Sequence, residues 1–342
     1  MLRSLSLFLL YLFNSYASYS QPQFEKVYPI AARATDIEKT IDSNYIVLGE
    51  IDASYNDTFV LIKIDKNGEI LWSKKYYDSV HCEATDIIET PDSGFAVAAG
   101  ILFRFDKNGD LLWQNEKYNC PVYYVKMDTN DGFIACGHTL IKGVIVKYDY
   151  NGNIDWAHKD WYFVNGVHRL SNGNYLFAIG YYDGFHLVEM NTEEDIINDN
   201  LVADMEVQSI TPLSDTTFLF TGISTNSALR IIITNTTGDI KLDRQYFNIY
   251  HSYQEEFLSS AIFKDGNYYI VTNIPYQWGN RGILFKIDST GVPGFARYYK
   301  YNGELRNLTE SFDGGFLLAG WVHMTYDSDM QLIKTNILGK TH

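Results

Sequence analysis

Residues 59–76 read FVLIKIDKNGEILWSKKY, and the fold of the chain is predicted from this segment and its copies. Two segments rich in apolar residues, 59–65 and 70–76, flank the pair Asn67–Gly68. An Asn-Gly pair between two such segments is a strong cue for a β-hairpin, because both central residues of the tight turn take positive φ. The stretch therefore predicts two antiparallel strands, with Gly68 in a left-handed conformation.

The same hairpin recurs along the chain, each time with a glycine followed by a bulky residue four positions later. The copies are Gly68 with Trp72, Gly109 with Trp113, Gly152 with Trp156, Gly238 with Leu242 and Gly291 with Phe295. A second motif is a polar turn closed by an aromatic residue. Its aromatics are spaced 38 to 50 residues apart, at Tyr45, Phe95, Phe133, Tyr175, Phe218, Tyr268 and Phe316. Repeats of this length, each holding four short strands, are typical of the blades of a β-propeller.

The repeats predict an all-β fold, a seven-bladed β-propeller of four-stranded antiparallel blades, in one domain covering residues 21–342. In the first repeat the strands are expected at 35–40, 45–48, 59–65 and 70–76. The seventh repeat lacks an outermost strand, whereas residues 24–28 belong to no preceding repeat. Phe24 and Tyr28 have the same spacing as Trp72 and Tyr76. We therefore expect the N-terminal strand to complete the last blade and close the ring.

The two motifs resemble those of known repeat families. The Asp-x-x-Gly-x-x-x-Trp hairpin is similar to the repeat of quinoprotein-like propellers, and the Asp-x-Gly-Phe turn looks like that of secreted bacterial repeat propellers. The resemblance covers residues 24–342 and implies the fold rather than an activity. Quinoprotein dehydrogenases of this kind have eight blades and two adjacent cysteines at the quinone, whereas Cys82, Cys120 and Cys136 are not adjacent here.

The first twenty residues have the layout of a secretory signal peptide. Arg3 precedes an apolar run over residues 5–13, and small residues follow up to Ser20. Nine apolar residues are too few to span a bilayer. We expect residues 1–20 to be a signal peptide cleaved after Ala17 or Ser20. The mature protein would then be exported, to the extracellular space, the cell surface or the periplasm, with no membrane span.

Charge and cysteine content exclude several classes of protein. The chain has 42 acidic and 27 basic residues, a net charge of -15, which makes nucleic acid an improbable partner because a phosphate backbone needs a basic face. Three cysteines cannot provide a disulfide framework. Cys82 and Cys120 occupy the same position in adjacent repeats, and the sequence leaves open whether they are bonded. Cys136 aligns with small apolar residues and is expected to be buried.

The longer, more variable loops of the repeat are the expected place of a site, because function on scaffolds concentrates in such loops. Aligned positions at the entrance of each innermost strand should surround the mouth of the central channel. Acidic and amide residues among them are Glu83, Glu206, Glu256, Glu304, Asp36, Asp86 and Asn307. One hypothesis is that Asp36, Asp86 and Asn307 bind a cation or a cationic ligand through their oxygens. The alternative is an ion-pair network of Arg33 with glutamates, with the Asp residues capping loop amides.

Aromatic residues in the same loops suit sugar stacking or protein recognition, and the alternative is that they pack against neighbouring loops. Our candidates among them are Trp161, Tyr182, Tyr253 and Trp278. The turn at Asp149 superficially resembles a calcium loop, but its copies at Asp65 and Asp106 favour a hairpin turn. Histidines are scattered without ligand spacing, and the sequence has no nucleotide-binding or nucleophile motif. We expect no metal and no cofactor.

These observations favour a non-catalytic, monomeric propeller that binds a protein or glycan through its variable loops. The alternative is a propeller enzyme, a glycoside hydrolase or lyase that uses carboxylates at the channel mouth. Fold alone does not decide between the two.

Overall fold

The computed structural model describes residues 23–30, 32–51, 58–77, 83–115, 121–129, 132–139, 142–248, 260–276, 279–299, 303–323 and 328–341. The expected signal peptide, Cys82 and Cys120 lie outside these ranges. Within them the chain forms strands joined by turns and contains no helix.

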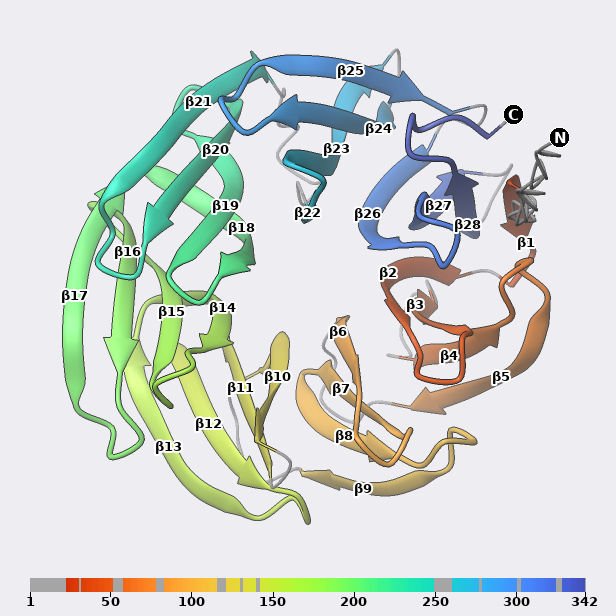
Figure 1. The fold of residues 1–342 in the computed structure, drawn as a ribbon. Coiled ribbons are helices and arrows are strands. Elements are labelled where there is room, and N and C mark those ends of the chain that lie inside the picture. Colours follow the sequence, from red (N-terminus) through yellow and green to blue (C-terminus); the bar gives the residue numbers. More distant parts are fainter. Residues whose placement is uncertain are drawn as a thin grey trace, which may run out of the picture.

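The strands form seven antiparallel sheets of four strands, arranged as the blades of a propeller around a central axis (Figure 1). From the inner to the outer strand, the first four blades are β2 (Ala32–Lys39), β3 (Tyr45–Ile51), β4 (Thr58–Ile64) and β5 (Ile70–Tyr77); β6 (Ala84–Glu89), β7 (Phe95–Ala99), β8 (Ile101–Phe105) and β9 (Leu111–Asn115); β10 (Tyr124–Thr129), β11 (Gly132–His138), β12 (Gly143–Asp149) and β13 (Ile154–Trp161); and β14 (Phe163–Arg169), β15 (Tyr175–Tyr181), β16 (Gly184–Met190) and β17 (Ile196–Ala203). The last three are β18 (Met205–Ser214), β19 (Thr217–Ser224), β20 (Ala228–Asn235) and β21 (Ile240–Asn248); β22 (Ser260–Lys264), β23 (Asn267–Tyr276), β24 (Gly279–Asp288) and β25 (Pro293–Tyr298); and β26 (Gly303–Glu310), β27 (Phe316–His323), β28 (Ser328–Thr335) and β1 (Phe24–Tyr28). The strands predicted for the first repeat agree with β2–β5 to within three residues at each end.

The ring is closed by the N-terminal strand, as the sequence predicts. Strand β1 pairs antiparallel with β28, from Phe24 opposite Lys334 to Tyr28 opposite Met330. In Figure 1 the red β1 lies at the outer side of the dark blue blade 7. The first and last parts of the chain therefore share one sheet.

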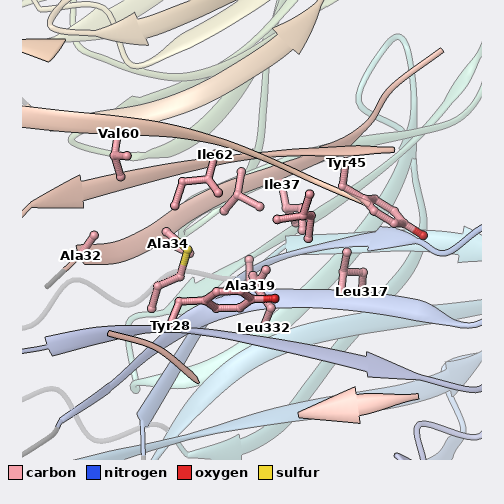
Figure 2. Packing of buried hydrophobic residues seen from close by; sticks show 13 residues of the cluster. Tyr28, Ala32, Ala34, Ile37, Tyr45, Val60, Ile62, Leu317, Ala319 and Leu332 are labelled. Carbon is pink, nitrogen blue, oxygen red and sulfur yellow. The ribbon is translucent and has the colours of Figure 1, made fainter. Parts of the chain in front are cut away.

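The apolar core is divided among the seven interfaces between neighbouring blades. In β3, Tyr45 and Val47 face blade 7, whereas Ile46 and Leu48 face blade 2. Figure 2 shows the first of these interfaces, where Tyr28 of β1 joins the cluster. Because the middle strands are buried on both faces, they read as continuous apolar runs instead of alternating patterns.

A contact between outer strands explains the recurring glycine and bulky residue. The ring of Trp72 packs on Gly109 of the next blade so closely that a Cβ atom there would lie 2.9 Å from it. Gly109 also has a φ of 79°, which favours glycine. Four residues after Trp72, the Tyr76 hydroxyl donates a hydrogen bond to the Gly109 carbonyl. We call this pair of contacts the aromatic–glycine clasp.

The clasp recurs around the ring. Tyr28 donates to Gly68, Tyr246 to Gly291 and Tyr299 to Gly339, over 2.7, 2.8 and 3.3 Å. Between blades 2 and 3, Asn115 replaces the tyrosine and donates to the carbonyl of Gly152 over 2.6 Å. The expected positive φ is confirmed at Gly68, Gly109 and Gly152, at 77°, 79° and 83°.

The clasp is absent from the described part of two junctions, between blades 3 and 4 and between blades 4 and 5. Asp160 and Val202 occupy the sequence position of Tyr76 and Tyr246, eight residues after the turn position. In blade 4 the glycine itself is replaced by Glu194, which still adopts a φ of 69°. The backbone of the turn is thus kept without the residue that favours it.

The polar turn between the first two strands is a structural motif. In blade 2, Asp92 accepts a hydrogen bond from Thr90 and pairs with Arg104, a residue only 1% exposed. Partial burial works against the charged form, but these hydrogen bonds and the Arg104 charge lower the pKa of Asp92 to about 2. Lys63 pairs with Asp42 in the same way over 2.6 Å. The Asp of this motif therefore ties its turn to the third strand.

A β-bulge lies in the half of the innermost strand nearer the loop face in five of the described blades, and the sequence did not reveal it. In blade 3 the register shift lies at the other end of the strand, between Met127 and Thr129. In blades 1, 2 and 7 the residues that follow the bulge are Asp36, Asp86 and Asn307. A bulge re-aims the side chains next to it. These three candidate residues thus occupy equivalent, specially directed positions.

Candidate functional site

The blades place their connections on opposite faces of the ring. The short turns after the first and third strands of a blade make one face, the turn face. The connections after the second strand and those between blades make the other, the loop face. Several loop-face segments lie outside the described residues, and with them Tyr253, Glu256 and Trp278. Trp161 ends β13, and its side chain is also outside the described part.

The glutamates at the loop-face end of the inner strands lie in different environments. Glu304 is only 4% exposed and accepts a hydrogen bond from the Asn280 amide over 2.9 Å. Glu206 is exposed and accepts a hydrogen bond from Gln208 over 3.1 Å. Glu83 is exposed as well. The aligned positions therefore do not give equivalent carboxylates.

Trp321 makes cation–π contacts with two arginines of this region. The guanidinium groups of Arg33 and Arg306 lie over its indole ring, 5.5 and 4.6 Å from the ring centre. Trp321 itself is 3% exposed and pairs across the sheet with Glu304. Cation–π contacts of this kind stabilise the boundary between blades 7 and 1.

The three residues after the bulge connect consecutive blades. Asp36 accepts the amide of Ile87 in blade 2 over 2.8 Å and a hydrogen bond from Asn307 in blade 7. Asp86 accepts the amide of Val125 in blade 3 over 2.8 Å. The structure thus brings Asp36 and Asn307 into contact, and these hydrogen bonds run from blade 7 through blade 1 to blade 3. The aspartates do cap backbone amides, those of the next blade and, for Asp36, also that of Ile37 in its own strand.

A second level of the inner strands holds titratable residues that the sequence analysis missed. Lys126 lies within 3.1 and 3.3 Å of the two oxygens of Asp86, and its side chain remains 42% exposed. Burial raises the pKa of Glu38 to about 7 and, with the charges of Asp86 and Glu38, also raises that of Asp36. Burial works against the charged form of Lys126, but the carboxylates outweigh it, so its pKa is raised.

His168 stands at the position of Glu38 and Lys126 in blade 4. The pKa of His168 is lowered from its usual value of 6.5, mainly by burial and secondly by the charge of Lys126. The signal for this level is in the sequence, because Glu38, Lys126 and His168 each precede the landmark aromatic by seven residues. The bulge hides it, because the alternation of faces shifts there.

Aromatic side chains at the loop face of blades 3 and 4 form two groups of ring contacts, which meet in the sequence at Tyr162 and Phe163 and which we together call the aromatic row. Its members are Tyr123, His138, Phe163, Tyr162, Tyr181 and Tyr182. His138 contacts both Tyr123 and Phe163, with ring centres 5.3 and 4.8 Å apart. Tyr162 contacts Tyr181 at 5.2 Å and Tyr182 at 4.7 Å. The ring of Tyr182 is 91% exposed, and Phe163 is 38% exposed.

Polar groups border the row on blade 4. His186 contacts the Tyr181 ring at 4.5 Å and lies between two carboxylates. Its Nδ1 is 2.7 Å from Asp199, and its Nε2 is 3.2 Å from Asp183. Asp183 and Asp199 keep 64% and 40% of their side chains exposed. Burial, followed by the charges of Asp199 and Asp183, raises the pKa of Tyr181 to about 12.

Other expectations concern turns, metals and membranes. Asp149 accepts the backbone amides of Asn151 and Asn153, as the hairpin interpretation predicts. Cys136 is fully buried with a free thiol. Across the described ranges no group of three or more His, Cys, Asp or Glu side chains is arranged to hold a metal ion. The same ranges contain no helix of the length and apolarity needed to cross a membrane.

The sequence matches no protein-family model and no curated protein. Solved structures do resemble this chain. A streptogramin B lyase is 13% identical with a TM-score of 0.60, over 92% of this chain and 98% of that one. A virginiamycin B lyase from Staphylococcus aureus is 13% identical with a TM-score of 0.59, over 92% and 99%. A protein of unknown function from Bacteroides caccae is 14% identical with a TM-score of 0.53, over 75% and 94%. At these identities the similarity concerns the fold alone.

Proposed function

We propose that this propeller is an exported binding module that recognises a protein or glycan ligand through its loop face, at the aromatic row. The observation that carries the proposal is the Tyr182 ring, which is 91% exposed yet held at 4.7 Å against Tyr162. A Tyr ring offers a large contact area with little side-chain entropy to lose on binding. A ring already held by its neighbours loses still less.

The position of the row supports the same role. It crosses the junction of two blades, so a ligand lying along it contacts two repeats at once. Phe163 begins the innermost strand of blade 4, which places one end of the row near the axis. Tyr182 lies at the tip of the β15–β16 hairpin. A ligand can thus reach from the inner strand of blade 4 to the connection between its two middle strands.

The test is a parallel screen of the mature protein against a glycan array and a displayed peptide library. For each hit, the dissociation constant is measured with wild-type protein, Tyr182→Ala and Phe263→Ala. Phe263 is a matched control, because it is 43% exposed and lies one residue before the end of β22, next to a turn on the opposite face. We expect Tyr182→Ala to weaken binding by about tenfold or more, as for an interface hot spot, and Phe263→Ala to leave it unchanged. Hits that bind both variants equally would contradict the proposal.

The second candidate is acid–base catalysis at the inner strands of blades 1–3. It is favoured by one observation, the pKa of Glu38 at about 7, close to the cationic Lys126. A carboxyl group that titrates near neutral pH is suited to proton transfer. Two of the structurally similar proteins are lyases, so the same fold occurs in enzymes.

This candidate is tested with chromogenic glycoside, ester and lactone substrates. An enzyme of this kind would show a pH–rate profile with an apparent pKa near 7. Glu38→Gln should abolish that step in the profile while the fold is kept. Any activity with an unchanged profile in Glu38→Gln would remove these residues from the mechanism.

A further inference from the structure

Negative charge borders the aromatic row on its blade 4 side. Asp183 and Asp199 lie on either side of His186 and use one oxygen each toward its ring nitrogens. Whichever protons the imidazole carries, it neutralises at most one of the two carboxylates. The group of Asp183, His186 and Asp199 therefore keeps a net negative charge beside the Tyr181 ring.

The neighbouring blade adds to this charge. Asp204 and Glu206 are exposed at the start of the innermost strand of blade 5. Arg230 of blade 5 is already held by Asp243, which accepts its guanidinium over 2.9 and 2.7 Å. Arg244 lies on the adjacent strand, opposite Ile231, and Lys142 and Lys159 belong to blade 3. The whole chain carries a net charge of -15.

Electron-rich rings and carboxylates together recognise cations. A guanidinium stacks on an aromatic face and forms paired hydrogen bonds with a carboxylate, both at once when the two groups are neighbours. Here the Tyr182 ring and the Asp183 carboxylate belong to adjacent residues at the tip of one hairpin, and both are largely exposed, at 91% and 64%. A neutral sugar would use the rings but would gain nothing from the long-range field of the acids.

We infer that the ligand of the loop face is a basic protein segment, one arginine of which stacks on Tyr182 and pairs with Asp183. The inference rests on the proposed binding role of the aromatic row and adds the chemical class of its ligand. Asp199, Asp204 and Glu206 attract further basic residues of the same segment and steer its approach.

The test uses three defined probes on the mature protein, measured by isothermal titration calorimetry. They are a peptide of alternating glycine and arginine, the same peptide with lysine in place of arginine, and maltohexaose as a neutral sugar. We expect the arginine peptide to bind more tightly than the lysine peptide, and both to weaken as salt rises from 50 to 300 mM, roughly tenfold for several ion contacts. Maltohexaose is expected not to bind.

The variants separate recognition from general attraction by an acidic protein. Tyr182→Ala should raise the dissociation constant of the arginine peptide about tenfold, and Asp183→Asn should raise it about threefold to tenfold. Asp215→Asn is the matched control, because it removes one exposed carboxylate from the opposite face. It should leave the dissociation constant within about twofold. Melting temperatures of all three variants establish that each is folded.

Three outcomes overturn the inference, and they distinguish it from the proposed function. Loss of binding in Asp215→Asn equal to that in Asp183→Asn would show attraction by net charge only. A neutral glycan that binds and depends on Tyr182 would refute the basic ligand but retain the binding module. Absence of any Tyr182-dependent hit, in these titrations and in the array and peptide screens, would refute both.

Discussion

The two sides of the ring are tied together differently, although they are built from the same repeat. At the junctions from blade 7 to blade 1 and from blade 1 to blade 2, an aromatic–glycine clasp holds the outer rim, through Tyr28 and Tyr76. At the inner strands of the same junctions, Asp36 bonds to blade 2 and to Asn307 of blade 7. These blades are thus joined at both edges of their sheets.

The junctions from blade 3 to blade 4 and from blade 4 to blade 5 lack both devices in the described residues. Their rims have Asp160, Val202 and Glu194 in place of tyrosine and glycine, and after the inner bulges stand Val167 and Ser209 instead of aspartate. Ser209 bonds within its own blade, to Thr221. The junction from blade 3 to blade 4 is tied in another way, because the buried Asp128 of blade 3 accepts hydrogen bonds from Arg169 and Tyr175 of blade 4, each over 2.7 Å. Blade 4, whose rim lacks the clasp, also carries several members of the aromatic row. The comparison indicates that the same repeat joins its blades by different devices, and that the clasp and the bulge aspartate are missing where the aromatic row lies.

The most severe break of this comparison is removal of β1. A chain that starts at Ile30 loses the outer strand of blade 7, exposes the edge of β28 and removes the clasp on Gly68. We expect the melting temperature to fall by ~10 °C or more, or the protein to aggregate. Differential scanning fluorimetry and size-exclusion chromatography measure the two outcomes. A truncated chain with the same melting temperature as the chain that starts at residue 21 would refute ring closure by β1.

The clasp is tested by a pair of glycine substitutions. Gly109 and Gly266 both have positive φ, 79° and 73°, but only Gly109 has a neighbouring ring, whereas Gly266 has no atom within 4 Å of an added Cβ. Gly266→Ala should lower the free energy of unfolding by about 1 kcal/mol, through backbone strain alone. Gly109→Ala should lower it by about 2–4 kcal/mol, because Trp72 must also move. Urea unfolding curves decide, and equal losses would mean that the clasp contributes little.

The charged inner strands of the tied side predict a pH dependence of stability. Folding raises the pKa of Glu38 from 4.5 to about 7, so between these values the native protein holds a proton that the unfolded chain has released. The free energy of unfolding should therefore fall as the pH rises from about 4.5 to 7. Asp36 acts in the same direction, and Lys126 and Asp86 face both groups.

Glu38→Gln removes this contribution. We expect the variant to be more stable than wild type at pH 8, by about 1–3 kcal/mol, and similar to it near pH 4.5. Urea unfolding at a series of pH values measures the difference. If the free energy of unfolding changed with pH in the same way in both proteins, Glu38 would not be the group responsible for the pH dependence. Asp92 does not interfere, because its pKa is lowered from 3.8 to about 2 and its contribution to stability is lost only below this pH range.

A smaller effect is expected from the hydroxyl of a single clasp. Tyr28→Phe keeps the ring but removes the hydrogen bond of 2.7 Å to the Gly68 carbonyl. The free energy of unfolding should fall by about 1 kcal/mol. Tyr182→Phe is the control, since this ring is 91% exposed and should show no change beyond about 0.5 kcal/mol. If Tyr28→Phe left the free energy of unfolding unchanged, the clasp would stabilise the protein through ring packing alone.

The smallest expected effect has the opposite sign and concerns blade 4, whose rim lacks the clasp. Glu194 has a φ of 69° where the other hairpins use glycine, so Glu194→Gly relieves strain. Its contact with His158, at 3.8 Å, is partly exposed and contributes little. We expect stabilisation by about 0.5–1 kcal/mol in urea unfolding. Glu193→Gly, at an exposed neighbour outside the positive-φ set, should destabilise instead, and equal effects of the two changes would contradict the strain argument.

Local rules determined the fold from the sequence alone. An Asn-Gly turn at Gly68 and its copies have few alternatives, because positive φ at those positions excludes most other conformations. The regular spacing of the landmark aromatics then fixed the number of blades, and the unpaired segment at Phe24 predicted the closure that β1 and β28 make. Cys136 was identified as a core residue because aligned positions in a repeat share their burial.

The candidate site depended on information that a repeat does not carry. Counting positions predicted equivalent glutamates, but Glu304 is buried with Asn280 whereas Glu206 is exposed, because side chains from other strands decide the environment. The bulge before Asp36 shifts which residues of that strand face the next blade, so Glu38 was missed. Lys126 was missed because its contact with Asp86 joins two blades. Of the predicted aromatic candidates, Tyr182 lies in the aromatic row, whose other members come together only through folding.

The sequence by itself thus determined the architecture, because turns and strand patterns are set by interactions between near neighbours along the chain. The tertiary structure decided which residues of different blades meet, as Tyr162 meets Tyr182 and Asp36 meets Asn307. Those meetings depend on bulges, on the packing of neighbouring blades and on the low dielectric of the interior. None of these is a property of one repeat read alone.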